Sequence, residues 1–342
     1  MKFGSFLLKR LLLSIFVIFG LSIVIFIISR GVPGDPARMA LGPGASEEVV
    51  QRLREEMYLD KSLPEQYFYW IRGVLSGDFG RSLVTRRAVL EDIKEYFPAT
   101  AEMAIFAGIL MPIFAILLGT IAARYNDTWV DNLIRILSYF GVAIPAFVVA
   151  IFFMLIFGYL WPILPVIGRL SSGISYPTRI TGLLTIDSLI QGNYVVFWDA
   201  LKHLILPSVA LSLGHIFQEA RITRSSMVDN ARKEFISLAR GYGIPERIIM
   251  FKYLLKPSLI PPLSIMALDF AASFSNAFLV ELIFNWPGIS RYGINAMLSK
   301  DLNAISAVII IFGTIFVIAN IIVDIAIIIL DPRIRLSTSG GI

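Results

Sequence analysis

Residues 11–29 read LLLSIFVIFGLSIVIFIIS, a run of nineteen residues without a charged side chain. A transmembrane helix needs about 20 predominantly apolar residues, because each helical residue rises 1.5 Å and the hydrocarbon core of a bilayer is about 30 Å thick. The run is too long for the apolar part of a cleaved signal peptide, and no small-residue cleavage site follows it. It therefore predicts a transmembrane helix near the start of the chain.

Further apolar runs of similar length follow along the chain. They cover residues 99–123, 133–160, 203–222, 258–284 and 304–330, and the run at 203–222 is the weakest. Each run is read as a helix, because a single segment in lipid must satisfy its own backbone polar groups. Of the 342 residues, 56% are hydrophobic and only 16% are charged, against about 25% charged in a typical soluble domain. The sequence predicts an all-α polytopic membrane protein with six transmembrane helices.

The composition also excludes several kinds of site. Cysteine is absent, which rules out disulfides, thiolate metal sites and a cysteine nucleophile. The two histidines, His203 and His215, are too few for a histidine-rich metal centre. The net charge of +5 is modest, and in a membrane protein such an excess reflects topology rather than nucleic-acid binding. We expect neither a metal site nor a nucleic-acid partner.

Lysine and arginine counts predict the orientation of the chain, since cytoplasmic loops carry an excess of both residues. With the N-terminus inside, the inside segments hold fifteen basic residues and the two short outside loops hold five. The segment between the first two spans is too long for its charges to affect orientation, although Arg30 and Arg38 lie close to the first span. Both termini are therefore expected on the cytoplasmic side of the cell membrane.

Four parts of the chain follow from these spans. Residues 1–30 form a short cytoplasmic tail and the first span, and residues 31–98 form an extracytoplasmic helical loop. Residues 99–330 form the core of five spans, and residues 331–342 form a cytoplasmic tail. In the loop, Ser46 is placed to cap one short helix and Pro64 to open another. The loop is expected to lie on the outer membrane surface, either as an interfacial cap without a ligand or as a contact for substrate or for a binding protein.

The segment 223–257 is expected to form an exposed helix–turn–helix in the cytosol. A helix that runs to Arg240 meets Gly241 and Gly243, which suit a left-handed stop. Pro245 is then placed to open a second helix that ends before Pro257. Small residues at the bend would allow another protein to approach the backbone, although the segment can also be interpreted as a plain loop between spans.

The same segment resembles the EAA loop of ATP-binding-cassette (ABC) importer permeases. The pattern of that loop is Glu-Ala-Ala, three residues, then Gly. Ala239 and Gly243 match it, whereas Ser237 stands in place of the glutamate and Leu238 in place of an alanine.

A wider resemblance covers nearly the whole chain. The chain resembles the dipeptide/oligopeptide permease family, in the subunit type with a long loop after the first span. The segments that carry the resemblance are PGDPA at 33–37, LDKSLPEQY at 59–67, GDFGRS at 77–82, PAT at 98–100, RxxRSSM at 221–227, ExxFxWPGI at 281–289 and LDPRIR at 330–335.

This resemblance implies the type I ABC importer permease fold and a heteromeric importer. Its implied partners are a second homologous permease, two cytoplasmic ATPases and an extracytoplasmic substrate-binding protein. The chain has no Gly-x-x-x-x-Gly-Lys-[Ser/Thr] phosphate-binding loop, so we expect no cofactor on this chain and ATP with Mg on the partner ATPases. The resemblance also implies that a coupling helix docks in an ATPase groove, formed by Glu234, Phe235, Ser237, Leu238, Ala239, Arg240, Gly241 and Gly243.

Ionisable residues inside spans are candidates for function, because a charge at the centre of a bilayer is costly. Asp269 lies nearest to a span centre, and we expect it to face the pathway or the partner permease, or to bond a neighbouring helix. Glu281 and Asp324 lie near span ends and are expected to bond other helices. His215 and Glu219 share one helix face, and Trp286 is expected at the outer membrane interface.

Two other functions stay open at the level of sequence. One is a proton-coupled secondary transporter that uses Glu102, Asp269 or Asp324, although the chain shows no clear inverted repeat. The other is an intramembrane hydrolase, for which paired aspartates at matching depth and a Gly-x-Ser-x-Gly turn are missing. Neither reading assigns a catalytic residue to the chain. Substrates of the resembled family include peptides, oligosaccharides and metal chelates.

Overall fold

The computed structural model describes residues 3–31, 35–42 and 44–330, without the side chains of 3–7, 9, 39–40, 323–324 and 326–330. Within these residues all regular elements are helical, apart from one isolated bridge between Arg81 and Ala88. The cytoplasmic tail expected at 331–342 and the last part of the LDPRIR segment lie outside the described residues.

Helices long and apolar enough to cross a bilayer coincide with five of the expected spans. They are α1 (Phe3–Gly31), α5 (Val89–Arg124), α9 (Tyr194–Ala231), α13 (Ile260–Ile283) and α15 (Leu302–Leu330). The helix α9 extends well beyond the expected 203–222, since it begins after the Asn193 N-cap and ends before the Arg232 C-cap. These five predictions are confirmed.

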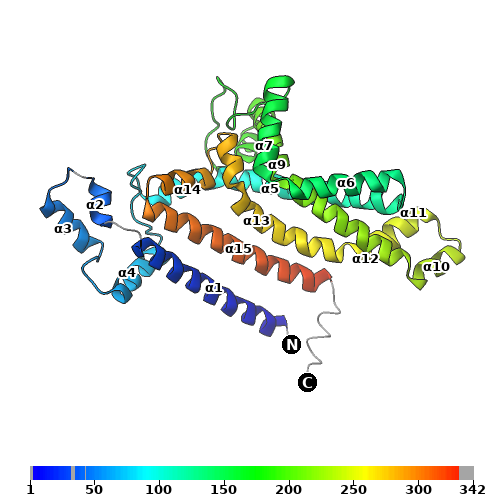
Figure 1. The fold of residues 1–342 in the computed structure, drawn as a ribbon, viewed down its shortest axis with the longest axis horizontal. Coiled ribbons are helices and arrows are strands. Elements are labelled where there is room, and N and C mark those ends of the chain that lie inside the picture. The colour runs from blue at the N-terminus through cyan, green and yellow to red at the C-terminus, as the bar shows by residue number, and fades with distance from the viewer. Residues whose placement is uncertain (1–2, 32–34, 43, 331–342) are drawn as a thin grey trace. The chain divides into compact units, whose positions relative to one another are not determined.

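The remaining expected span is not one continuous helix. Residues 133–160 fall in α6 (Trp129–Ala143), α7 (Ala146–Phe153) and the π-helical segment η1 (Met154–Leu160), with a bend of 103° between α6 and α7. Figure 1 shows α7 turning away from α6 at this bend. The break falls at Ile144 and Pro145, because proline has no backbone N–H to continue the hydrogen-bond ladder. Six spans result if the bent pair counts as one.

The chain divides into two compact units that interleave in sequence. One unit contains Pro98–Arg291 and the last part of α15, from Ile318. The other contains Phe3–Phe97 and Tyr292–Val317. The helices α5 and α15 each run from one unit into the other.

The unit that contains the N-terminal helix includes α1 and the short helices α2 (Pro36–Leu41), α3 (Glu47–Glu56) and α4 (Leu63–Leu75). Ser46 and Ser62 stand at the N-caps of α3 and α4, and a capping box with Glu65 begins α4. The hydroxyls of Ser22 and Tyr67 lie 2.7 Å apart and join α1 to α4. The start of α15 holds the segment before α5, because the Asp301 carboxylate accepts hydrogen bonds from the Ser82 hydroxyl (2.6 Å) and the Leu83 N–H (2.7 Å).

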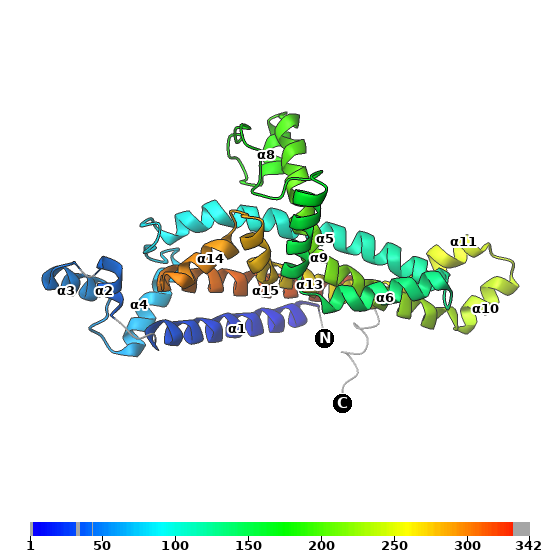
Figure 2. The same cartoon turned by 45° about the horizontal axis from the view of Figure 1, so that its top comes forward.

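In the other unit, α9 packs against α6, α7 and α13. Close approach depends on glycine: a Cβ on Gly119 of α5 would meet the Ala220 carbonyl of α9 at 2.6 Å, and a Cβ on Gly141 of α6 would meet the Phe217 ring. Small residues of this kind let helices pack backbone to backbone in a membrane. The core combines α5, α7, α9 and α13 around Met103, Leu204, Leu211, Val280, Phe284 and Trp286. In Figure 2, α8 (Leu184–Ile190) and α10 (Glu234–Gly241) lie beyond opposite ends of α9.

Candidate coupling elbow and transmembrane pocket

The elbow after α9 is formed by residues 232–258. It contains α10, the short α11 (Glu246–Ile248), the π-helical segment η2 (Ile249–Leu255) and α12 (Lys256–Ser258). Gly243 has a left-handed φ of +71°, as its type suggests. The sequence prediction was wrong about Gly241, which is the last residue of α10. It was also wrong about Pro257, since the helical path continues through α12 to Ser258.

The helix α10 has one buried and one exposed apolar face. Ile236 and Ala239 are buried against Met227 and the segment η2. On the outer face, Leu238 is 61% exposed and Tyr242 is 85% exposed, and Phe235 lies beside them. The inner face fixes α10 on the end of its own unit, and the outer face leaves three large side chains exposed. Exposed apolar groups in such a cluster are typical of a protein interaction site.

Polar contacts hold the shape of the elbow. Arg240 donates to Glu246 over 2.8 Å across the turn, and this hydrogen bond lowers the pKa of the Glu246 carboxyl below its ordinary value. The amide of Asn230 donates to the Ser258 hydroxyl (2.7 Å) and so joins the end of α9 to α12. Glu234 and Ser237 also lie in α10. The elbow is therefore a braced unit rather than a loose loop.

A buried ion pair joins α9 to α6 near the end of α9 that leads into the elbow. Arg224 of α9 pairs with Asp131 of α6, with 2.5 Å between Nε and Oδ1 and between Nη2 and Oδ2. Asp131 is fully buried, and it also accepts the backbone N–H of Asp127 (2.9 Å). From the sequence, Arg224 entered only as part of the RxxRSSM segment, and no partner was predicted for it.

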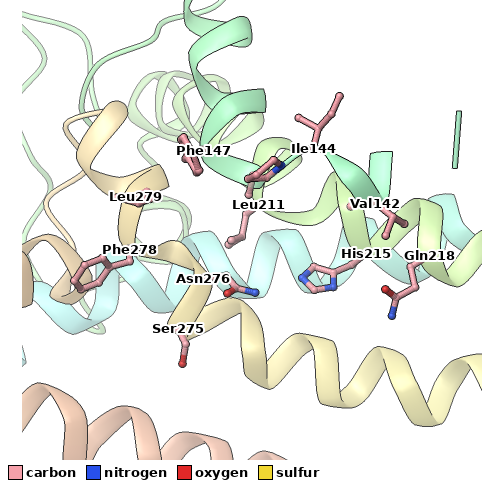
Figure 3. Close-up of a pocket in the computed structure, with 13 residues that line it drawn as sticks. Val142, Ile144, Phe147, Leu211, His215, Gln218, Ser275, Asn276, Phe278 and Leu279 are labelled. Atoms are coloured by element: carbon pink, nitrogen blue, oxygen red, sulfur yellow. The ribbon is translucent and has the colours of Figure 1, made fainter. Parts of the chain in front are cut away.

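A pocket of about 510 Å³ lies between the α6–α7 bend and the helices α9 and α13. Figure 3 shows His215 of α9 and Asn276 of α13 on its wall, with Ile144 and Phe147 of the bend opposite. The volume falls within the range of about 300–1,000 Å³ that small-molecule sites occupy. The α9 residues Leu211, Gly214, His215 and Gln218 face the pocket at helical spacing. The α13 wall is formed by Ser275, Asn276, Phe278 and Leu279.

Behind this wall lies a pair of acidic side chains. The Nδ1 atom of His215 lies 3.2 Å from Oδ2 of Asp269. Glu219, one turn beyond His215 on α9, is fully buried, and its carboxyl faces that of Asp269. Neither carboxylate oxygen of Glu219 receives a hydrogen bond from the described part of the chain. These three side chains do not converge as metal ligands would. Asp269 thus contacts a neighbouring helix and stands next to the pocket.

The other intramembrane candidates lie elsewhere. Glu281 of α13 accepts hydrogen bonds from the Thr100 hydroxyl of α5 and from the Arg291 N–H, the latter over 2.9 Å. Asp324 lies in α15, and its side chain is outside the described residues. Glu102 pairs with Arg169 (2.5 Å) and accepts from the Thr185 hydroxyl (2.6 Å). Glu102, which lies on α5, thus binds Arg169 and Thr185, and Glu281 joins α13 to α5 and to the backbone of Arg291.

Trp286 does not stand at a membrane interface, so this expectation was wrong. Its side chain is only 1% exposed, and its indole N–H donates to the Ala99 carbonyl over 2.9 Å. The Arg169 guanidinium lies 5.8 Å from the centre of its ring. The Trp-Pro-Gly turn thus folds inward onto α5, which hydropathy alone could not show.

Two family models match the chain. The model described as binding-protein-dependent transport system inner membrane component covers residues 115–336, and the N-terminal model of such membrane components covers residues 3–104. Both the elbow and the pocket fall within the first range.

Similar proteins match along almost their whole length. The chain is 35% identical over 335 residues to the probable D,D-dipeptide transport system permease protein of Escherichia coli K12, covering 98% of each. It is 35% identical over 331 residues to the dipeptide transport system permease protein of Alkalihalophilus pseudofirmus, covering 97% of this chain and 99% of the relative. The glutathione transport system permease protein of Shigella flexneri is 30% identical over 331 residues, with the same coverage.

Proposed function

This chain belongs to the family of binding-protein-dependent transport system inner membrane components, and from that premise we propose that it forms half of the translocation pathway of an ABC importer for peptides. The family match over residues 115–336 is the observation that carries the proposal. The relatives named above are permeases for dipeptides and glutathione, which favours short peptides over oligosaccharides as substrates. The second half of the pathway would be a homologous permease.

ATP hydrolysis would take place on two separate ATPase subunits, which would hold the ATP and Mg. The elbow offers them a docking surface, because Phe235, Leu238 and Tyr242 are exposed while Ile236 anchors α10 from beneath. Closure of the ATPases would move α10 as a rigid body. The braced elbow and the pair of Arg224 with Asp131 would pass that motion to the spans, which rock between inward-facing and outward-facing states.

The orientation follows from this proposal. The elbow and both termini would face the cytoplasm, as the distribution of lysine and arginine predicts. The helices α2 to α4 and α14 (Ile289–Leu298) would then face the outside. There the segment 31–98 would meet an extracytoplasmic substrate-binding protein.

The docking surface is tested by co-purification. Leu238→Glu places a charge on the exposed face of α10 without disturbing its buried face, so the variant should fold and fail to retain the ATPases. The matched control is Val49→Glu, which makes the same type of change at a 46% exposed site on α3 and should retain them. Equal ATPase recovery with both variants would show that α10 is not the docking helix.

A proton-coupled secondary transporter remains the alternative, and the spans contain the carboxyl groups it would need. The two mechanisms differ in their energy source. The importer should concentrate a labelled peptide in proteoliposomes only with ATP, the ATPases and the binding protein. Uphill uptake by this chain alone, driven by a pH gradient without nucleotide, would establish the alternative.

A further inference from the structure

The pocket between the α6–α7 bend, α9 and α13 has a marked chemical asymmetry. On one side Ile144 and Phe147 present apolar surface, and on the other His215, Gln218 and Asn276 present polar groups. The amide side chains of Gln218 and Asn276 each donate and accept hydrogen bonds. Such a wall can bind the amide groups of a main chain, whichever side chains the ligand carries.

The charge behind the polar wall is negative. Asp269 contacts the imidazole of His215 at 3.2 Å, and the buried carboxyl of Glu219 faces that of Asp269 rather than a cationic side chain. Two carboxyl groups side by side make the region behind the wall acidic. The oxygens of Glu219 receive no hydrogen bond from the described residues, so this acidic pair lacks full compensation there.

A positive group on a passing substrate would supply that compensation. A charged group at the centre of a bilayer is costly. A protonated amino terminus is such a group, and every unmodified peptide carries one. A neutral His215 ring has one nitrogen that can accept a hydrogen bond from such a group.

We propose that this pocket is a transient binding site for the amino-terminal ammonium group of a peptide, with His215 as its contact and the pair of Glu219 and Asp269 as its counter-charge. This inference rests on the proposed function and adds a selectivity that belongs to the permease itself. Gln218 and Asn276 bind the adjoining main-chain amide, and the apolar side of the pocket accepts the first side chain. The site lowers the free-energy barrier to passage of the ammonium group across the membrane without binding the peptide tightly.

The test compares trialanine with its Nα-acetyl derivative, which has lost the positive charge. The complete transporter is reconstituted with its binding protein in proteoliposomes, and the maximal uptake rate of each peptide is measured at saturating binding protein. The readout is the ratio of the two rates within one preparation, so differences in protein yield cancel. The affinity of the binding protein for each peptide is a separate measurement that substitutions in this chain leave unchanged.

Asp269→Asn or Glu219→Gln alone leaves one carboxyl group that can ionise, so only the double variant removes the charge of the pair. The double variant should lower the ratio of free to acetylated peptide about tenfold, which corresponds to about 1.4 kcal/mol, and each single variant should lower it by less. Glu56→Gln, the same type of change at an exposed site on α3, should leave the ratio unaltered. A second kind of variant, Asn276→Asp, adds a carboxylate to the pocket wall at an exposed position and should raise the ratio.

An equal loss of uptake for both peptides in the double variant, together with an unchanged ratio in Asn276→Asp, would overturn the inference. The pair would then be a structural link or a contact with the second permease. A wild-type complex that transports neither peptide would contradict the proposed function itself, and it would do so before any variant is compared.

Discussion

At the scale of single residues, the buried carboxylates divide into those with full sets of donors and those without. Asp187 has a full set: it accepts from the Thr181 N–H (2.7 Å), the Thr181 hydroxyl (2.6 Å), the Gly182 N–H (2.9 Å) and the Ile180 N–H (3.2 Å). Glu219 has none from the described residues. The four donors of Asp187 fix a loop, whereas Glu219, buried and without donors, belongs to the acidic pair proposed above as a counter-charge.

The first prediction concerns Asp187 and pH. Burial alone would raise its pKa, but hydrogen bonds from Thr181 and from backbone N–H groups outweigh this effect and lower the pKa. A carboxyl group whose pKa is lowered by folding stabilises the folded state at pH values above its ordinary pKa, which is about 3.9 for aspartate. This contribution is lost as the pH falls through the lowered pKa. The turn at 180–187 should therefore stay ordered from neutral pH down to about pH 4.

Asp187→Asn should weaken this turn at neutral pH by about 2 kcal/mol, the usual strength of hydrogen bonds to a charged group. Amide hydrogen exchange across 180–190, corrected for intrinsic rates, measures the change. Protection equal to that of the wild type at pH 7 would show that the charge of Asp187 does not hold the turn.

A second prediction at this scale concerns Asp131. Removing one partner of a buried ion pair leaves an uncompensated charge and costs about 3–5 kcal/mol. Asp131→Asn should therefore lower the melting temperature of the purified protein strongly, because Arg224 would lose its carboxylate. Asp127→Asn is the matched control: Asp127 is exposed with a φ of +62°, a conformation that asparagine tolerates. Similar melting temperatures for the two variants would contradict the assignment.

At the scale of elements, hydropathy predicted where the long helices lie but not where one of them breaks. The prolines at 98, 112 and 207 lie inside helices that continue past them, whereas Pro145 marks a sharp bend. The apolar character is the same on both sides of Pro145, so a hydropathy window finds one span. Proline weakens the helix locally, but whether the chain bends there also depends on packing such as that of α7 against α9 and α13, which hydropathy does not record.

The pocket was partly accessible from sequence. The spacing of His215 and Glu219 placed them on one helix face, and Asp269 stood out as an acidic residue in a span. Their contact depends on the register of α13 against α9, which is set by side-chain packing over many residues. The elbow was predicted more completely, because glycine and proline specify local backbone geometry: Gly243 is left-handed and Pro245 caps α11.

Glycines at helix crossings give the third prediction. A Cβ on Gly119 would lie 2.6 Å from the backbone oxygen of Ala220, which cannot move without moving α9. Gly119→Ala should therefore cost about 1–3 kcal/mol, as overpacking usually does, and lower the melting temperature. Gly20→Ala in α1 meets nothing within 4 Å and should be neutral or stabilising by up to about 1 kcal/mol, because alanine favours helix. A larger loss at Gly20 than at Gly119 would show that the α5–α9 contact is not tight.

At the scale of the whole molecule, the two units interleave in sequence. The unit with the N-terminal helix consists of two segments, Phe3–Phe97 and Tyr292–Val317. The Asp301 carboxylate joins these segments, because it accepts hydrogen bonds from the Ser82 hydroxyl and the Leu83 N–H. The elbow and the pocket lie in the other unit, within Pro98–Arg291. The residues proposed to dock ATPases and those proposed to contact substrate therefore share one compact body, as direct mechanical coupling requires.

The last prediction tests the orientation on which this coupling depends, and the absence of cysteine from the sequence makes it simple. Tyr242→Cys places a single thiol on the elbow at an 85% exposed position, and Leu298→Cys places one at the end of α14 at an 80% exposed position. The chain is expressed without partner subunits, so no ATPase covers the elbow. A membrane-impermeant maleimide should label Leu298→Cys only in right-side-out vesicles and Tyr242→Cys only in inside-out vesicles. Labelling of Tyr242→Cys from the outside would place the exposed face of α10 where no cytoplasmic ATPase reaches it, and the coupling mechanism would fail whatever the family of the chain.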